Sequence, residues 1–214
     1  CFRVQYSLNG KTYNQIGNTL RSQMMILMRI TDFLRSIRFL TIHGYPEQAG
    51  TLASSIFELS HTATYFLHNP EAVMNWLSCD DITMKMPKLI GVNDYKELAK
   101  RNYAVKGFES GHEAEYKVYK QLCWMKHSHP IMQDLLLIDN NAQFQIGPYT
   151  DEKSINHAWF SIEHSGRLTE MVIGNLVGLQ EDEYIKSQLD FLANIRVALD
   201  KKAIARFGSN DPFK

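Results

Sequence analysis

Two helical patterns that follow each other almost without interruption constrain this chain more than any other feature. Apolar residues recur at helical spacing from about residue 19 to residue 43, and again from Pro46 to about residue 67. Gly44 ends the first pattern, where a positive φ costs glycine little, and Pro46 suits the first turn of a new helix. Two long helices joined by so short a turn must lie antiparallel. The sequence therefore predicts a helical hairpin.

The first of these two helices has an unusually wide apolar face, which favours a central position for it. The residues that define this face are Ile26, Ile30, Phe33, Ile37 and Leu40, flanked by Met24, Leu27 and Leu34. In the second helix, Glu58 and His61 lie one turn apart within an otherwise mostly apolar and small-residue sequence.

The rest of the chain also shows mainly helical periodicity. We expect a short helix that starts at Pro70 under an Asn69 cap, followed by longer helices. The expected ranges of the later helices are 93–105, 112–126, 151–179 and 181–207. Residues 79–111 and 130–150 have the least regular patterns, and a small hairpin or an irregular excursion is expected within the second of these ranges. The prediction is one all-α domain over residues 1–214, a bundle of about five long helices, with 1–18 as lead-in and 208–214 as tail.

Composition narrows the function classes. The chain has 23 Lys plus Arg and 23 Asp plus Glu, so a zero net charge argues against a surface built for wholesale phosphate binding. Cys1, Cys79 and Cys123 form no disulfide framework, which favours a reducing compartment. No run approaches the roughly 18 apolar residues of a spanning helix, and no signal peptide is visible, although the chain begins with Cys rather than Met. We expect a cytoplasmic protein with no cofactor and no membrane partner.

Two Glu-x-x-His pairs raise the possibility of a metal site. Glu58 with His61, and Glu109 with His112, have the local spacing found in di-metal carboxylate bundles. Such a site needs two more carboxylates from other helices, for which Glu163 is only a nominal candidate. On a helical wheel Glu58 and His61 instead belong to a polar sector opposite the apolar face. That sector contains Thr51, Ser54, Glu58, His61, Thr62 and Tyr65. The preferred interpretation is a polar or solvated stripe, and the alternatives are a metal site or a polar groove beneath a closely packed helix.

A second line of polar residues lies within an apolar sector of the 112–126 helix. Its members are His112, Tyr116, Tyr119, Cys123 and His127. Buried Tyr and His require hydrogen-bond partners, so the line predicts a structural polar network. The functional alternative is a ligand or catalytic pocket, with His127 as an acid–base or phosphate-contacting residue. Cys123 is expected to be a buried, inert thiol. His157 and His164 share a face with apolar residues and are expected in the core.

Arg38 and His43 form an Arg-x4-His arrangement, the spacing of the catalytic motif in HEPN ribonucleases. In that superfamily the two residues act on RNA phosphates and lie in a late helix, whereas here they lie at the end of the first long helix. Arg38 and His43 are therefore further catalytic candidates beside His127 and Glu58.

Residues 25–76 and 119–130 also resemble a bacterial helical family of undefined function. The resemblance rests on Ser54-Ser55-Ile56-Phe57-Glu58, on Asn69-Pro70-Glu71, and on Tyr119-Lys120-Gln121-Leu122-Cys123 with His127. The family has Arg where this chain has Ser54, and Ser where it has Cys123. Its similarity to abortive-infection and HEPN-like proteins implies a defence or RNA-related role. The resemblance also implies that Glu58 and His127 lie near each other.

These observations lead to three hypotheses. The first is an interaction or defence-associated module with a polar pocket formed by Glu58, His61, His112, Tyr119 and His127. The second is a HEPN-like ribonuclease, and the third is a bundle metalloprotein that uses the Glu-x-x-His pairs. The candidate partners are a second copy of the chain, RNA, or another protein.

Overall fold

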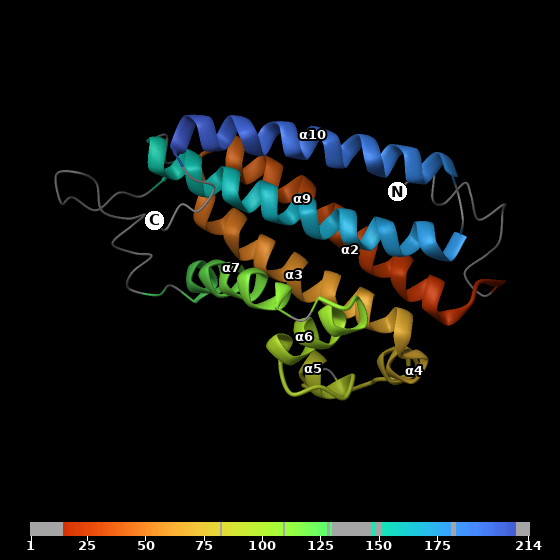
Figure 1. Cartoon of the computed structure of the whole chain (residues 1–214). Helices are drawn as coiled ribbons and strands as arrows, with labels where there is room; N and C mark the ends of the chain where they lie inside the picture. The colour runs from red at the N-terminus through yellow and green to blue at the C-terminus, as the bar shows by residue number, and fades with distance from the viewer. Residues whose placement is uncertain are drawn as a thin grey trace.

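The computed structural model describes residues 15–81, 83–108, 110–127, 129, 147–148, 151–180 and 183–208. Within these ranges the chain is a bundle of eight helices without strands, as Figure 1 shows, which confirms the predicted all-α class. The helices are α2 (Asn18–Ile42), α3 (Pro46–His68), α4 (Pro70–Leu77), α5 (Met86–Leu89), α6 (Tyr95–Val105), α7 (Gly111–Lys126), α9 (Glu152–Gln180) and α10 (Glu183–Phe207). The hairpin or excursion expected within 130–150 and most of the lead-in and tail lie outside the described residues.

The predicted hairpin of α2 and α3 is confirmed. Gly44 has a φ of 78°, the left-handed conformation in which glycine lacks the steric penalty of other residues. The backbone N–H of Tyr45 donates to the carbonyl of Leu40 at 2.8 Å, and Pro46 begins α3. The two helices therefore run antiparallel and pack along their length (Figure 1).

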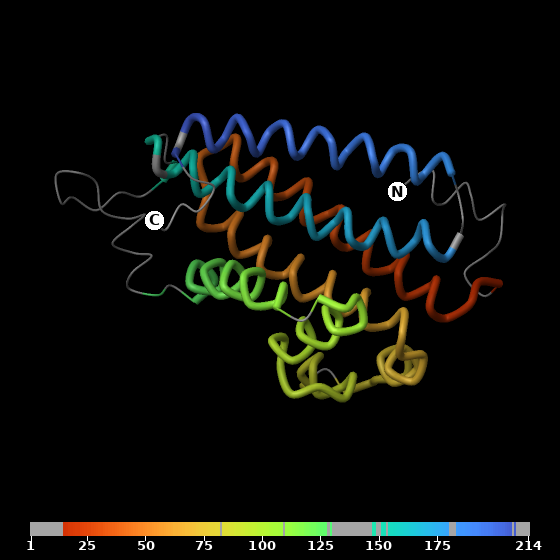
Figure 2. The backbone as a smooth tube through the Cα atoms, in the orientation of Figure 1, coloured from red at the N-terminus to blue at the C-terminus, as the bar shows by residue number. Residues whose placement is uncertain are grey.

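The central helix of the bundle is α3 rather than α2. Helices α2 and α9 pack on one side of α3, and α6 and α7 on the other (Figure 2). The expectation of a central α2 is wrong, although its named apolar face is buried or half-buried, because α2 packs on α3, α9 and α4, whereas α3 packs on α2, α9, α6 and α7. Phe39 and Ile42, near the end of α2, are 61% and 68% exposed.

Most of the polar sector of α3 is buried, with Thr51 and Glu58 half-buried, so its interpretation as a solvated stripe is also wrong. Ser54, His61, Thr62 and Tyr65 are all buried because α6 and α7 cover this face. Small residues permit the close approach. A Cβ added to Gly50 would overlap Sδ of Met125 on α7. The alternative of a polar groove beneath a closely packed helix comes nearest to the observed arrangement.

Helix α4 begins at Pro70 as predicted, but Asn69 does not cap it through its side chain. The Asn69 Nδ2 group instead donates to the carbonyl of Tyr65 in the preceding helix, at 2.8 Å. The clearest side-chain cap is at α6, where Oδ1 of Asp94 accepts a hydrogen bond from the backbone N–H of Glu97 at 2.8 Å.

Helices α9 and α10 form an antiparallel pair whose ends lie within two residues of the predicted ones. Helix α10 packs mainly along α9 and forms the outer edge of the bundle, on the side opposite α4–α7 (Figure 1). Among the helices that are described, none combines the length and apolarity needed to cross a membrane.

Candidate functional site

A carboxylate at the centre of the structure joins four helices. Nε2 of His61 on α3 lies 3.0 Å from Oε2 of Glu115 on α7. The hydroxyl of Tyr103 on α6 donates to the same oxygen at 2.8 Å. The other carboxylate oxygen, Oε1, lies 2.9 Å from Nη1 of Arg167 on α9. We call these four residues, with Asn102 and His164, the buried network.

Asn102 fixes the orientation of the His61 ring. Its Nδ2 group donates to the carbonyl of His61 at 2.8 Å and lies 3.2 Å from Nδ1 of the imidazole. Because Nδ1 then accepts a hydrogen bond, these partners place the ring hydrogen on Nε2, where it points at Glu115. The imidazole ring also packs against Phe57, one turn earlier, with 4.3 Å between ring centroids.

The environment of Glu115 stabilises its charged form. Burial by itself would raise the pKa of this carboxyl, but hydrogen bonds from His61 and Tyr103 and the charge of Arg167 outweigh it and lower the pKa to about 2. Burial and the neighbouring Glu115 charge raise the pKa of Tyr103 to about 12. Glu115 is therefore ionised and Tyr103 neutral at ordinary pH.

His164 is the uncharged member of the buried network. Its Nδ1 atom lies 3.2 Å from Nη2 of Arg167, and its ring is parallel to those of Phe57 and Phe160. Burial, with the nearby Arg167 charge, lowers the pKa of His164 to about 3. Its Nε2 atom has no hydrogen-bond partner among the described residues. A neutral imidazole is the form that such a site tolerates.

The buried network is closed to substrates. The side chains of His61 and Glu115 are 0% and 3% exposed, whereas Tyr103 and Arg167 are partly exposed, Arg167 at 35%. A general acid or base must come within hydrogen-bond distance of its substrate, which this burial prevents. The network instead holds α3, α6, α7 and α9 in one relative arrangement, because each helix supplies a partner that the others need.

Glu58 lies in a separate polar site at the surface. Its Oε1 atom accepts from the hydroxyl of Tyr119 at 3.0 Å and lies 3.4 Å from Nζ of Lys126. Beside it is a cavity of about 190 Å³ whose lining includes Arg29, Phe33, Glu58 and Tyr95. Burial and the charge of Glu58 raise the pKa of both Tyr95 and Tyr119, so both phenols remain protonated.

The five residues predicted to form one pocket are divided between different surroundings. Glu58 and Tyr119 are in contact, whereas His61, on the same helix as Glu58, is directed to Glu115. His112 is buried at the start of α7. His127 is exposed at the other end of that helix, and it is Lys126 that contacts Glu58. Burial raises the pKa of the Cys123 thiol, which favours the protonated, unreactive form.

The metal candidates do not come together in the part of the chain that is described. No group of three or more His, Cys, Asp or Glu side chains there is arranged to hold a metal ion. Glu58 and His61 have different partners, and Glu163 lies 3.5 Å from Arg196 instead. Glu109 lies outside the described residues, so the second Glu-x-x-His pair is not placed.

Arg38 and His43 are both exposed near the end of α2. Nδ1 of His43 lies 2.8 Å from the carbonyl of Phe39, and the two rings are 4.1 Å apart between centroids. The imidazole is thus held against its own helix, with one nitrogen engaged.

Sequence reasoning missed Glu115, Asn102, Tyr103 and Arg167. One signal was present for Glu115, because it lies three residues after His112 and four before Tyr119, on the same side of α7. The partners on α6 and α9 had no comparable signal. His61 and Glu115 are 54 residues apart, and nothing local links them.

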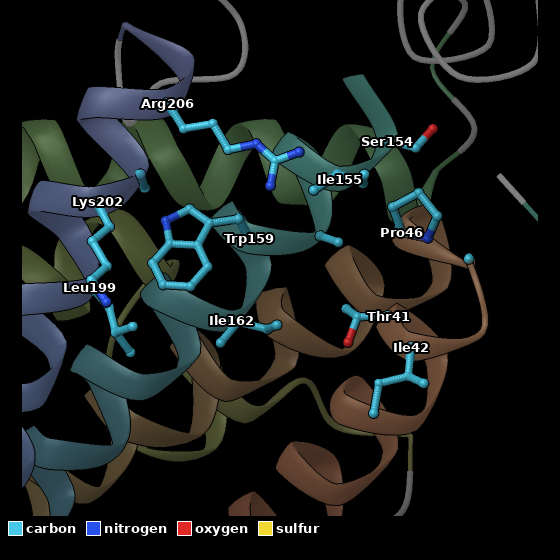
Figure 3. A pocket seen from close by; sticks show the side chains of 13 residues that line it. Thr41, Ile42, Pro46, Ser154, Ile155, Trp159, Ile162, Leu199, Lys202 and Arg206 are labelled. Carbon is cyan, nitrogen blue, oxygen red and sulfur yellow. The ribbon is translucent and has the colours of Figure 1, made fainter. Parts of the chain in front are cut away.

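A large apolar groove is bounded by α2, α9 and α10. It consists of two cavities of about 430 and 260 Å³ that share Trp159, Ile162 and Leu199 as lining residues. Figure 3 shows Trp159 and Ile162 of α9 between Leu199 and Lys202 of α10 and Thr41 and Ile42 of α2. No sequence pattern indicated this groove, because it exists only where three helices meet.

Comparison with family models, with curated proteins and with solved structures gives no match to this chain.

Proposed function

We propose that this protein is an interaction module that docks an amphipathic helix of a partner in the groove between α2, α9 and α10. The observation that carries the proposal is the groove itself. Two of the ionisable groups that suggested chemistry have structural partners instead, because His61 is enclosed with Glu115 and Glu58 is engaged with Tyr119 and Lys126. The groove, by contrast, is large, apolar and open at the surface.

The floor of the groove has the spacing of a helix-packing seam. Six of the ten α9 residues that line it recur at alternating intervals of four and three, and the other four, Ser154, Ala158, Glu163 and Glu170, are direct neighbours of these in the sequence. The six are Ile155, Trp159, Ile162, Gly166, Thr169 and Ile173. This is the heptad spacing with which one helix packs lengthwise on another. The seam extends for about 27 Å at 1.5 Å per residue, which accommodates a helix of roughly 18 residues.

Gly166 lies in the middle of this seam. A Cβ added there would meet no other atom within 4 Å, so the space above Gly166 is open. A small residue at such a point allows a second helix to approach closely. Ile155 and Ile162, on either side of the groove's larger cavity, are each 40% exposed and provide apolar surface for the partner to cover.

Selection of a displayed library of amphipathic helical peptides against the purified protein tests this proposal. Peptides that bind should alter the fluorescence of Trp159 and should lose that effect in Trp159→Phe. Gly166→Met fills the open space and should weaken binding by roughly tenfold or more. Gly178→Met is the matched control, because Gly178 is on the same helix with equally open surroundings and does not line the groove. Equal binding to both variants would reject the groove as the docking site.

A HEPN-like ribonuclease is the second candidate, favoured by the exposure of both Arg38 and His43 at the end of α2 that borders the groove. Cleavage of labelled RNA by the wild-type protein should then fall in His43→Ala. His127→Ala tests a second exposed imidazole. RNA that stays intact with the wild-type protein, or equal cleavage by all three proteins, would reject this function.

A further inference from the structure

Helix α10 has an exposed stripe of residues. The sequence intervals between successive members are the same whether they are counted from the N-terminal or the C-terminal end. The members are Tyr184, Gln188, Phe191, Ile195, Leu199, Lys202 and Arg206. All seven are exposed, and Phe191 reaches 60%. The intervals between them are four, three, four, four, three and four residues, symmetric about Ile195. At about 100° per residue these positions fall within one sector of roughly 80°.

We propose that the helix docked in the groove is α10 of a second copy of this chain, antiparallel to the first across a two-fold axis at Ile195. This inference rests on the proposed function and names its partner. An interface about a two-fold axis must be complementary to itself, and a stripe symmetric about its central residue meets that requirement. Ile195 would lie on Ile195 of the partner subunit, and Phe191 on Leu199 of the partner subunit.

The chemistry of the stripe matches this pairing. The three central positions, Phe191, Ile195 and Leu199, form apolar layers. Towards the ends, Gln188 would meet the partner's Lys202, and Tyr184 would meet the partner's Arg206, where a guanidinium can stack on a phenol ring. The pairing therefore buries apolar side chains at its centre and leaves its charged groups at the rim, as stable interfaces do.

Charge along α10 favours the antiparallel direction. Residues 181–190 hold four acidic residues and Lys186, whereas the last two turns of α10 hold Lys201, Lys202 and Arg206 and no acid. Antiparallel pairing brings the acidic start of each helix level with the basic end of the other, and it also opposes the two helix dipoles favourably. Parallel pairing would place like charges at both ends.

The position of the stripe links it to the groove. Four of its members, Ile195, Leu199, Lys202 and Arg206, also line the groove. A helix packed on the stripe would therefore cover Trp159 and Ile162 on α9 as well. The opposite side of α10 has Val197 and Ile204 exposed, seven residues apart, and forms no comparable row.

Cysteine cross-linking of the full chain tests the axis directly, in a background with Cys1→Ser, Cys79→Ser and Cys123→Ala. Ile195→Cys should form a disulfide-linked dimer under mild oxidation, because a residue on a two-fold axis meets its own copy. Val197→Cys is the matched control, with similar exposure on the far side of the same helix, and should remain monomeric on a non-reducing gel. Equal cross-linking of the two variants would overturn the proposal.

Sedimentation of variants without introduced cysteines provides a second measurement. Ile195→Glu should raise the dimer dissociation constant by roughly 100-fold, because it buries a carboxylate in an apolar layer. Val197→Glu should leave the dissociation constant unchanged. A wild-type chain that is monomeric at high concentration, yet still binds selected helical peptides at Gly166, would reject the self-pairing and leave the proposed function standing. A monomer that binds no such peptide would reject both.

Discussion

The imidazole of His61 and the carboxylate of Glu115 are hydrogen-bonded at 3.0 Å in the interior of the bundle, 54 residues apart in sequence. Tyr103 and Arg167 complete the hydrogen bonding of the carboxylate. A buried charge is tolerated when its partners are all in place and becomes costly when one is removed. The contact between α3 and α7 is thus tied to the positions of α6 and α9.

Glu115→Gln should lower the free energy of unfolding by about 3 kcal/mol, because it leaves the Arg167 guanidinium without its carboxylate. Urea denaturation measures this change. Glu113→Gln, at an exposed position on the same helix, is the control and should change stability by less than about 0.5 kcal/mol. Adding Arg167→Met to Glu115→Gln should recover part of the loss. A Glu115→Gln protein as stable as the control would contradict the role given to the buried network.

Stability should fall as the pH falls, in two separable windows. The pKa of His164 is about 3 in the folded protein against an ordinary value near 6.5, so between these pH values the unfolded chain binds a proton that the folded chain does not. The pKa of Glu115 is about 2 against an ordinary value near 4.5, which adds a second loss at lower pH. His164→Gln should flatten the stability profile between pH 6.5 and 4.5, and Glu115→Gln below pH 4.5. Chemical denaturation at a series of pH values measures both, and profiles parallel to wild type would refute the assignments.

Gly50→Ala should destabilise the protein by about 1–3 kcal/mol, although alanine is the better helix former. The new methyl group overlaps Sδ of Met125, so α3 and α7 must separate or Met125 must leave its position in the core. Met125→Ala in the same protein should relieve the clash and cost less than it does alone. Gly178→Ala on α9 has free space and should instead stabilise by about 0.5–1 kcal/mol. Thermal denaturation compares the variants, and a stabilised Gly50→Ala would show that the helices are not so close.

Arg196→Met should loosen α10 from α9. Nε of Arg196 lies 3.1 and 3.0 Å from the two carboxylate oxygens of Glu170, and Nη1 lies 3.3 Å from Asp200. The substitution removes the cation shared by these acidic groups, so amide exchange in α10 should accelerate while exchange in α3 changes little. Arg196→Lys should be intermediate, because an ammonium group cannot reproduce the forked geometry. Unchanged exchange in α10 would mean that apolar packing alone holds the helix.

The helix boundaries were predictable because the signals that set them are local. Gly44 and Pro46 mark the turn between α2 and α3, and the ends of α9 and α10 follow from their apolar periodicity. Cap chemistry was less secure, since Asn69 has a choice of acceptors and bonds to Tyr65. For the candidate site, the sequence allowed the prediction that Glu58 and Tyr119 lie in one polar pocket. It did not allow the prediction that His61 has different partners from theirs.

The sequence by itself determined three features of the fold: the all-α class, the positions of the long helices, and the hairpin of α2 and α3. Each of these features depends on apolar periodicity and on turn residues that lie within a few positions of one another in the sequence. Tertiary structure alone decided that most of the polar sector of α3 is buried, that Glu115 accepts from His61, and that α2, α9 and α10 leave a groove between them. The physical reason is that periodicity records how apolar each side of a helix is on average. The partner that a polar side chain meets depends on helices from distant parts of the chain, and their relative positions are set only when the whole bundle packs.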